Sequence, residues 1–460
     1  MREDGRDKQF EGSRRLLERA RQSVAGGANS NMRVLPYHLP LAIDRAEGAR
    51  VWDVDGNELI DMNMGYGPLI FGHRPAMVLR AIEEEIQRRG TVLGFPHELS
   101  HQVAELVKKS FPSIDLLRFS STGTETAQTA VRLARAHTGR PLIVMFEGHY
   151  HGSSDAVFHR YHAPLDALAA QAQGRAIPGT AGMNGAPRDA IVLPWNDADT
   201  LSALMAARGE EIAAIIMEPV AGNAGVIPPR PGFLQCARVA ADAAGSLLIL
   251  DEVITGFRIA RGGAQQRFGV RADLTLLAKA LSGGVPVGAV GGRADIMQQI
   301  VDGRVFHGGV YSGNPMSMAA ALAVQRAYDA DGERTFADLE RGAAQLAGGL
   351  RHIFVEAGVP ALVRHVGAML SCFFLKQEDT PEPMDYRAVA EAADAERYIR
   401  FQHRAQRAGV YFHPNLFEPW YLSTAHTPAV IDEVLERLET VAKRGDWLAA
   451  GADQPQGVGV

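Results

Sequence analysis

Cysteine is nearly absent from this 460-residue chain, which contains only Cys236 and Cys372. Because the two lie far apart in apolar surroundings, we expect no structural disulfide and a cytoplasmic location. No apolar run is long enough to cross a membrane, and the N-terminal residues lack the apolar core of a secretory signal. The formal net charge of −6 gives no general attraction to nucleic acid or to an anionic membrane, so we expect neither as a partner.

The rest of the composition is that of an ordinary globular protein. Apolar residues make up 46% of the chain and charged residues 22%, and the length suits one large domain or two. The 48 glycines suit a loop-rich enzyme better than a helical bundle. The composition therefore indicates a globular protein, and the sequence motifs indicate its chemistry.

Three short apolar runs are each followed by a charged residue. They are 212–217 with Glu218, 246–250 with Asp251, and 274–278 with Lys279. A run of this kind, bounded by turn signals, is typical of a buried parallel strand. Ligands of open α/β sheets bind outside the carboxyl ends of such strands. Each charge alone could mark only a strand that leaves the core, but three in succession, with glycine-rich loops behind them, favour a ligand site.

An acid and an amine at strand ends suit one cofactor chemistry. The amine of Lys279 can form a Schiff base with a carbonyl cofactor, and it becomes reactive once burial or a nearby cation lowers its pKa. Asp251, facing a pyridine nitrogen, would keep that nitrogen protonated, so that the ring draws electrons from the substrate. This pair of residue types is the pyridoxal phosphate (PLP) arrangement. Lys279 and Asp251 are therefore the predicted catalytic residues.

A candidate anion site lies at the start of a predicted helix. Thr122-Gly123-Thr124-Glu125 precedes apolar residues at helical spacing, which continue to a stop at Gly139. Thr122 and Glu125 match a capping box. Free backbone amides and hydroxyls at a helix N-terminus bind anions well. An ordinary cap without a ligand would leave the same pattern, so this motif alone is weakly specific.

A tyrosine between two histidines follows a further predicted strand, 142–146. The segment reads Glu147-Gly148-His149-Tyr150-His151-Gly152. The histidine spacing does not fit one face of a helix, and the nearby acids form no recognisable metal motif, so we predict no metal site. A tyrosine at a strand end can instead lie flat on a ring, because aromatic faces stack well.

The remaining patterns predict a second, smaller domain. A helix is expected over 11–22 and a hairpin over 51–61, where Asp55-Gly56 is a strong turn signal. From about Thr335, helical patterns alternate with short strands. The expected parts are an N-terminal arm with part of the small domain (1–60), a large domain (61–330), a C-terminal small domain (331–450) and a loose tail (451–460).

Several motifs together are far more specific than any one of them. They are Gly26-Gly27-Ala28-Asn29-Ser30, Asp53-Val54-Asp55-Gly56-Asn57, Gly123-Thr124-Glu125, residues 146–152, Glu218-Pro219, residues 251–258, Lys279, Pro286-Val287-Gly288-Ala289, Ser312-Gly313-Asn314-Pro315 and Ala425-His426-Thr427. On these motifs the chain resembles the class III aminotransferases, PLP enzymes of fold type I, and among them most the glutamate-1-semialdehyde 2,1-aminomutases. The resemblance implies an α/β fold, with a mainly parallel sheet of the seven-stranded type in the large domain and a smaller α/β domain beside it.

The resemblance also implies roles for individual residues. Lys279 would carry PLP as a Schiff base and shuttle a proton, and Asp251 would hold the proton of the pyridine nitrogen. The implied cofactor-binding residues are Thr122, Gly123, Thr124, Tyr150, Glu218, Asn223, Asp251, Val253, Lys279, Gly309 and Val310. The implied substrate-binding residues are Ser30, Arg33, Tyr66, His151 and Glu418. A homodimer with shared active sites is expected, in which Gly309 and Val310 serve the partner's cofactor.

Two of the implied substrate residues have ordinary alternatives. Arg33 could hold a carboxylate through two parallel hydrogen bonds, but most arginines are surface residues. Glu418 lies in an apolar segment that could raise its pKa, but it could equally be an ion-pair partner.

The chain departs from the aminomutases near the substrate. They have Ser-Trp where this chain has Gly65-Tyr66, threonine at Val310, and smaller residues at 419–421. Bulky aromatic residues there should narrow or reshape the pocket. We therefore predict a PLP-dependent aminotransferase, which moves an amino group between an amino acid or amine donor and a carbonyl acceptor through a Lys279 Schiff base. The alternatives are the aminomutase reaction and a cofactor-binding protein that has lost catalysis.

Overall fold

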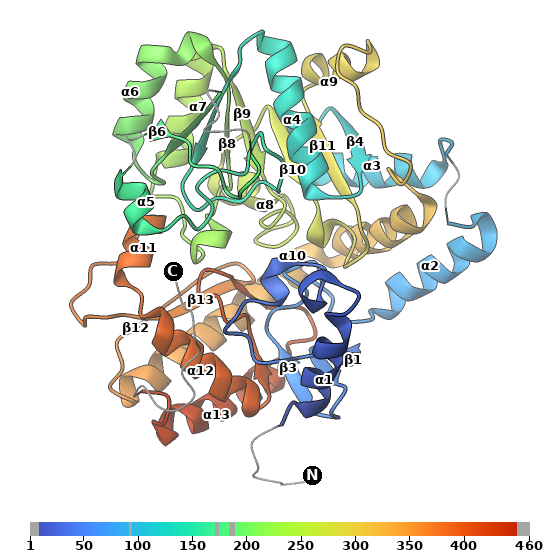
Figure 1. The fold of residues 1–460 in the computed structure, drawn as a ribbon. Coiled ribbons are helices and arrows are strands. Elements are labelled where there is room, and N and C mark those ends of the chain that lie inside the picture. Colours follow the sequence, from blue (N-terminus) through green and yellow to red (C-terminus); the bar gives the residue numbers. More distant parts are fainter. Residues whose placement is uncertain (1–8, 92–93, 171–173, 184–188, 449–460) are drawn as a thin grey trace.

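An eight-stranded sheet forms the centre of the computed structural model, which describes residues 9–91, 94–170, 174–183 and 189–448. The sheet has the order β4-β11-β10-β9-β8-β5-β7-β6 (Figure 1). Its strands are β4 (Leu116–Ser120), β5 (Leu142–Phe146), β6 (Gly174–Arg175), β7 (Ala190–Leu193), β8 (Ile212–Met217), β9 (Leu247–Asp251), β10 (Leu274–Leu277) and β11 (Gly288–Gly292). All run in one direction except β11 and β6. The predicted mainly parallel sheet is confirmed, with the two-residue β6 as an additional edge strand.

Both faces of this sheet are covered, which explains why the strands β5, β7 and β8 are apolar throughout. Alternate residues of β9 enter different cores: Leu247 and Ile249 enter one, and Leu248 and Leu250 enter the other. The helices that supply these cores are α4 (Gly123–Thr138) and α9 (Ala294–Val301) for the first, and α6 (Ala198–Arg208) and α7 (Phe233–Ala244) for the second (Figure 1).

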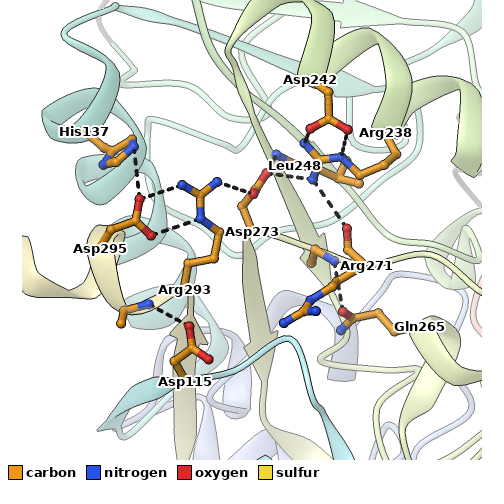
Figure 2. A network of polar contacts seen from close by, with 12 residues as sticks. Asp115, His137, Arg238, Asp242, Leu248, Gln265, Arg271, Asp273, Arg293 and Asp295 are labelled. Atoms are coloured by element: carbon orange, nitrogen blue, oxygen red, sulfur yellow. Dashed lines mark hydrogen bonds and ion pairs between the residues drawn. The ribbon is translucent and has the colours of Figure 1, made fainter.

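Asp273 holds the amino ends of the central strands (Figure 2). It directly precedes β10, and its Oδ2 accepts hydrogen bonds from the N–H of Leu248 and from Nη1 of Arg238, both at 2.7 Å. Its Oδ1 accepts one from Nη1 of Arg293 at 2.9 Å. These bonds help to fix the position of β10 between β9 and β11. They thereby help to position Lys279, which follows the opposite end of β10.

Segments from both ends of the chain build two smaller sheets. One has the order β1-β2-β3-β14 and the other β12-β13-β15. Their strands are β1 (Ile43–Glu47), β2 (Arg50–Asp53), β3 (Glu58–Asp61), β14 (Val410–Tyr411), β12 (Ala361–Val366), β13 (Met369–Phe374) and β15 (Trp420–Tyr421). β14 pairs with β3 in parallel, so the N-terminal arm and the C-terminal third share one sheet. The helices of this region are α1 (Glu11–Ala20), α11 (Tyr386–Ala392), α12 (Ala395–Arg407) and α13 (Pro428–Arg444).

One long helix, α10 (Pro315–Glu356), connects the two regions (Figure 1). It packs against α2 (Ala76–Arg89) and α3 (Glu98–Ser110) beside the large sheet, and against α13 and β12 beside the small ones. Its backbone is non-helical at Asp331, with φ −150° and ψ 33°. The bend falls next to the domain boundary predicted at 330, although the boundaries themselves stay predictions, and the predicted tail at 451–460 lies outside the described residues. The short helices α5 (Leu165–Ala170) and α8 (Gly263–Phe268) complete the large region.

No helix in the described part of the chain is both long and apolar enough to cross a membrane. Cys236 and Cys372 are both free thiols.

Candidate active site

Three charged residues lie at neighbouring strand ends of the large sheet. β9 lies between β8 and β10, and its last residue, Asp251, pairs with Leu276 of β10. Glu218 directly follows β8, and Lys279 follows β10 after one intervening residue. Because these strands are parallel, the three side chains start from one edge of the sheet.

Asp251 is buried and held by two neighbours. Its Oδ2 lies 2.8 Å from Nδ1 of His151, and its Oδ1 accepts the N–H of Val253 at 3.1 Å. The His151 side chain is also buried. The structure puts the His151 ring against Asp251, and the substrate contact that the resemblance implied for His151 stays a prediction. The sequence could not show the contact between His151 and Asp251, because it depends on how the loop after β5 folds over β9.

Glu218 organises the loops around the site. Its Oε1 accepts the N–H of Tyr150 at 2.7 Å and Nδ2 of Asn223 at 3.1 Å, and its Oε2 accepts the N–H of Gly222 at 3.0 Å. Burial raises the pKa of Glu218 to about 7, although the hydrogen bonds and nearby His151 oppose the shift. Glu218 therefore positions Tyr150 and Asn223, two of the residues expected to touch the cofactor.

Lys279 begins a single 3₁₀ turn, Lys279–Leu281, with φ of +44°. A non-glycine residue in this left-handed region is strained, and such strain gathers at functional sites. Burial lowers the pKa of Lys279, although the carboxylates of Glu418 and Glu218 oppose the shift. A lysine with a lowered pKa has more of the neutral amine that attacks carbonyl groups.

The N-terminus of α4 forms the predicted capping box. The Thr122 hydroxyl accepts the N–H of Glu125 at 3.2 Å, and Oε2 of Glu125 accepts the N–H groups of Ser121 at 2.7 Å and of Thr122 at 2.9 Å. Thr122 therefore uses both its hydroxyl and its amide inside the cap. The amides of Gly123 and Thr124 lie in the first helical turn, where no carbonyl of the helix can accept them. They are the groups left to bind an anion.

Gly123 brings the helix start close to the lysine strand. A Cβ atom at Gly123 would lie 3.3 Å from Cγ2 of Val253 and 4.0 Å from Cβ of Ala278, the residue before Lys279. The anion-binding amides, Val253 and the Lys279 turn therefore surround one small volume. A side chain at position 123 would fill part of it.

Two tyrosines and Glu418 form a further part of the candidate site. The ring of Tyr150 lies 4.9 Å from that of Tyr161, and the Tyr161 hydroxyl donates to Oε1 of Glu418 at 3.3 Å. Glu418 is buried, and its charge contributes to raising the pKa of Tyr66 to about 12, after the larger effect of burial. Sequence reasoning missed Tyr161, because it lies in a loop without regular periodicity.

Of the implied substrate residues, Ser30 and Arg33 lie within the N-terminal arm and Tyr66 lies shortly after β3. Arg33 ends a 3₁₀ turn, Asn31–Arg33, and is exposed. The Tyr66 hydroxyl donates to the carbonyl of Met32 at 3.2 Å, which ties this turn to Tyr66. Ser30 is half-buried directly before the turn.

Arg258 is a second residue whose role the sequence did not reveal. It is buried, donates to the carbonyl of Gly67, and lies 4.8 Å from the ring centre of Tyr421. No carboxylate in the described ranges forms an ion pair with it. Its charge contributes to lowering the pKa of Lys279. The Arg258 motif was visible in the sequence, but only the fold brings Tyr421 against it.

Gly309 and Val310 do not join the other site residues within this chain. Val310 is 74% exposed, in the loop between α9 and α10. Their implied role in a partner subunit's site stays a prediction.

The chemistry of the pocket fits PLP. Asp251 can accept a pyridinium N–H in addition to its two present contacts, the amides of Gly123 and Thr124 suit a phosphate, and Lys279 supplies the amine. Tyr150 and Val253 supply apolar surface for the two faces of a ring.

Comparison with known proteins gives a consistent result. The family model for aminotransferase class III matches residues 32–441. Glutamate-1-semialdehyde 2,1-aminomutase from Thermomicrobium roseum is 43% identical over 93% of this chain and 97% of its own length. The same enzyme from Chloroflexus aurantiacus is 41% identical over 91% of this chain and 94% of its own.

Solved structures agree over the whole fold. An ω-transaminase from Sphaerobacter thermophilus matches with a TM-score of 0.84 and 31% identity, covering 95% of this chain and 98% of its own. A transaminase with PLP bound matches with a TM-score of 0.82 and 27% identity, covering the same shares. A glutamate-1-semialdehyde aminomutase from Pseudomonas aeruginosa matches with a TM-score of 0.81 and 26% identity, covering 95% and 94%. The chain therefore belongs to the class III aminotransferases and is a PLP-dependent enzyme of that family.

Proposed function

We propose that the chain is a glutamate-1-semialdehyde 2,1-aminomutase, which moves an amino group from carbon 2 to carbon 1 of one molecule while the carbonyl moves the other way. The observation that carries the proposal is the identity of 41–43% to aminomutases over nearly the full length of both chains. It reverses the order of our sequence-based readings, in which a two-substrate aminotransferase came first.

Lys279 is the proposed acid–base residue. When bound, PLP withdraws electrons from the substrate carbon that loses its proton. Nζ of Lys279 takes the proton from the amine-bearing carbon and returns a proton at the other site. The lowered pKa keeps more of this amine neutral and able to accept the proton. Asp251, oriented by His151, holds the proton of the pyridine nitrogen.

The substrate has one carboxylate, and Arg33 is the proposed group that holds it. Its guanidinium has no ion-pair partner in the described ranges, so its fork is available for a carboxylate. Ser30 and Tyr66 lie beside it, and Glu418 closes the pocket near Lys279.

A two-substrate aminotransferase is the second candidate, and Tyr421 favours it. This side chain packs on Gly67, where a Cβ atom would lie 3.0 Å from Cε1 of the tyrosine. It is bulkier than the residues expected in an aminomutase and alters the pocket next to Arg258. The similarity to the ω-transaminase supports this candidate as well.

A homodimer is proposed for either reaction. Phe95, Phe306 and Val310 are 78%, 80% and 74% exposed, which is unusual for large apolar side chains. Their two loops lie together, because Nε2 of His97 contacts the carbonyl of Gly313 at 2.7 Å. A partner subunit would cover this surface and receive Gly309 and Val310. Sedimentation equilibrium of the wild type and of Val310→Glu tests this; a wild-type monomer that turns over at a normal rate would refute it.

The reaction is tested by supplying glutamate-1-semialdehyde to the PLP-loaded protein without any acceptor. The aminomutase proposal predicts that the isomer with the amine on carbon 1 accumulates. If amino donors such as β-phenylalanine or simple amines instead yield their carbonyl products, and the semialdehyde is not isomerised, the second candidate replaces the first. A cytoplasmic location is proposed for either enzyme, in keeping with the two free thiols.

A further inference from the structure

We propose that a second small-molecule site lies beside the active site and binds an amphipathic carboxylic acid. The site is a cavity of about 450 Å³ between the segment that precedes β1 and the sheet β1-β2-β3-β14. The volume is within the ~300–1,000 Å³ that is usual for small-molecule sites. Most of its wall is apolar, including Leu17, Leu35, Leu39, Leu41 and Ile43. The ligand's body would therefore be a hydrocarbon chain or an aryl group.

The cavity is distinct from the PLP site. Its described wall includes Arg33 and Tyr66 but not Lys279, Asp251 or Glu218. Tyr66 is part of the wall and is held through its hydroxyl to the carbonyl of Met32. A ligand here would contact the residues that border the proposed substrate pocket without reaching the catalytic lysine.

Two buried polar atoms in the described wall of the cavity have no hydrogen-bond partner. Asn63 is 6% exposed, and its Oδ1 accepts no hydrogen bond. Nε2 of His38 is also buried and unpartnered. Both residues line the cavity. Since a buried polar atom without a partner is unfavourable, a ligand with a hydroxyl group near its far end, which can donate to Oδ1 of Asn63, would be stabilised there.

The free charge of the wall is positive. Arg21 and Arg33 are exposed, and within the described ranges neither forms an ion pair. Asp61 is the only carboxylate among the described lining residues, and it is already occupied. Its Oδ2 contacts Nε2 of His73 at 2.8 Å, and its Oδ1 accepts the N–H of Asn63 at 2.8 Å. Arg33 is already assigned to the substrate carboxylate, which leaves the guanidinium of Arg21 to hold the carboxylate head of a ligand whose apolar tail lies in the cavity.

The test is calorimetric titration of octanoate into the PLP-loaded full-length enzyme. We expect saturable binding at one site per chain, and weaker binding of octanol, which lacks the carboxylate. Arg21→Ala should weaken octanoate binding about tenfold, as expected for the loss of one charge-assisted hydrogen bond. Lys279→Ala should bind octanoate as the wild type does, because Lys279 is not on the wall. This variant also separates the failure of this inference from the failure of the proposed reaction.

Two variants test the location. Ala46→Phe places a ring into the cavity from β1 and should abolish binding, whereas Val239→Phe, on the exposed surface of α7, should not. Asn63→Leu provides a second location test if Ala46→Phe fails to fold, and it should weaken ligands that carry a terminal hydroxyl more than octanoate itself. Absence of saturable binding at millimolar octanoate would overturn the proposal. So would unchanged octanoate binding in Ala46→Phe, or loss of octanoate binding in Lys279→Ala.

Discussion

Nδ1 of His151 lies 2.8 Å from Oδ2 of Asp251, and both side chains are buried. The contact joins the loop after β5 to the end of β9, and it orients the acid that we propose to hold the proton of the cofactor's nitrogen. A ring that holds an acid in place affects the reaction without touching the substrate. We therefore propose a positioning role for His151, while the substrate contact implied by the resemblance stays a prediction.

Replacing His151 with alanine should lower kcat by ~10–100-fold, the equivalent of losing one hydrogen bond to a charged group. The absorbance spectrum of bound PLP should also change with pH, because Asp251 would hold the nitrogen proton less firmly. The control is His137→Ala, which removes a partly exposed histidine 3.9 Å from Asp295. Stopped-flow half-reactions measure the rate, and an unchanged rate with an unchanged pH profile would contradict the role.

Glu218 should make the apoenzyme less stable as the pH rises from about 5 to about 7. Its pKa is about 7 in the folded protein, compared with an ordinary value of 4.5. In this range the unfolded chain has lost the proton while the folded chain still binds it, so the free energy of unfolding falls with rising pH, by ~3 kcal/mol in total. Above pH 7 both states are ionised and the effect is complete.

Urea unfolding of the apoenzyme at several pH values, compared with Glu218→Gln, measures this contribution. The difference in the free energy of unfolding between the wild type and Glu218→Gln should change with pH between about 5 and about 7, and should stay constant above about pH 7. If the wild type and the variant show the same slope throughout, the raised pKa of Glu218 is refuted.

Asp273→Ala should lower the free energy of unfolding by ~2–4 kcal/mol, because it leaves the buried Leu248 amide without its acceptor and removes one of the carboxylates that pair with Arg238 and Arg293. Asp295→Ala is the matched control. Asp295 also pairs with Arg293, but its side chain is 53% exposed, so its loss should cost less than ~1 kcal/mol. Equal losses in chemical denaturation would show that the network does not depend on Asp273.

Local patterns in the sequence were enough to predict the elements that carry the chemistry. Apolar runs that end in charge predicted β8, β9 and β10, because strands buried on both faces have no polar residues until they leave the core. The Thr122–Glu125 capping box was predicted because its partners are only three residues apart. In both cases the pattern lies within a few neighbouring residues, so it can be recognised from the sequence alone.

Contacts between distant segments could not be predicted in this way. Tyr161 meets Glu418, and Arg258 meets Tyr421, although the two partners of each pair are far apart in the sequence. No local periodicity marks such pairs, because only the packed fold brings them together. The pairing of β14 with β3 also joins distant segments. Local patterns therefore could not show that the two ends of the chain share the sheet β1-β2-β3-β14.

We propose above all that PLP is attached to Lys279. The attachment can be located directly, because the chain has few lysines. Its six lysines are Lys8, Lys108, Lys109, Lys279, Lys376 and Lys443. Reduction of the PLP-loaded enzyme with borohydride would fix the cofactor to its lysine, and peptide mass spectrometry would locate it. The account predicts one modified peptide per chain, containing Lys279, and no visible cofactor band in Lys279→Ala. Stoichiometric modification of another lysine, with Lys279 unmodified, would contradict it.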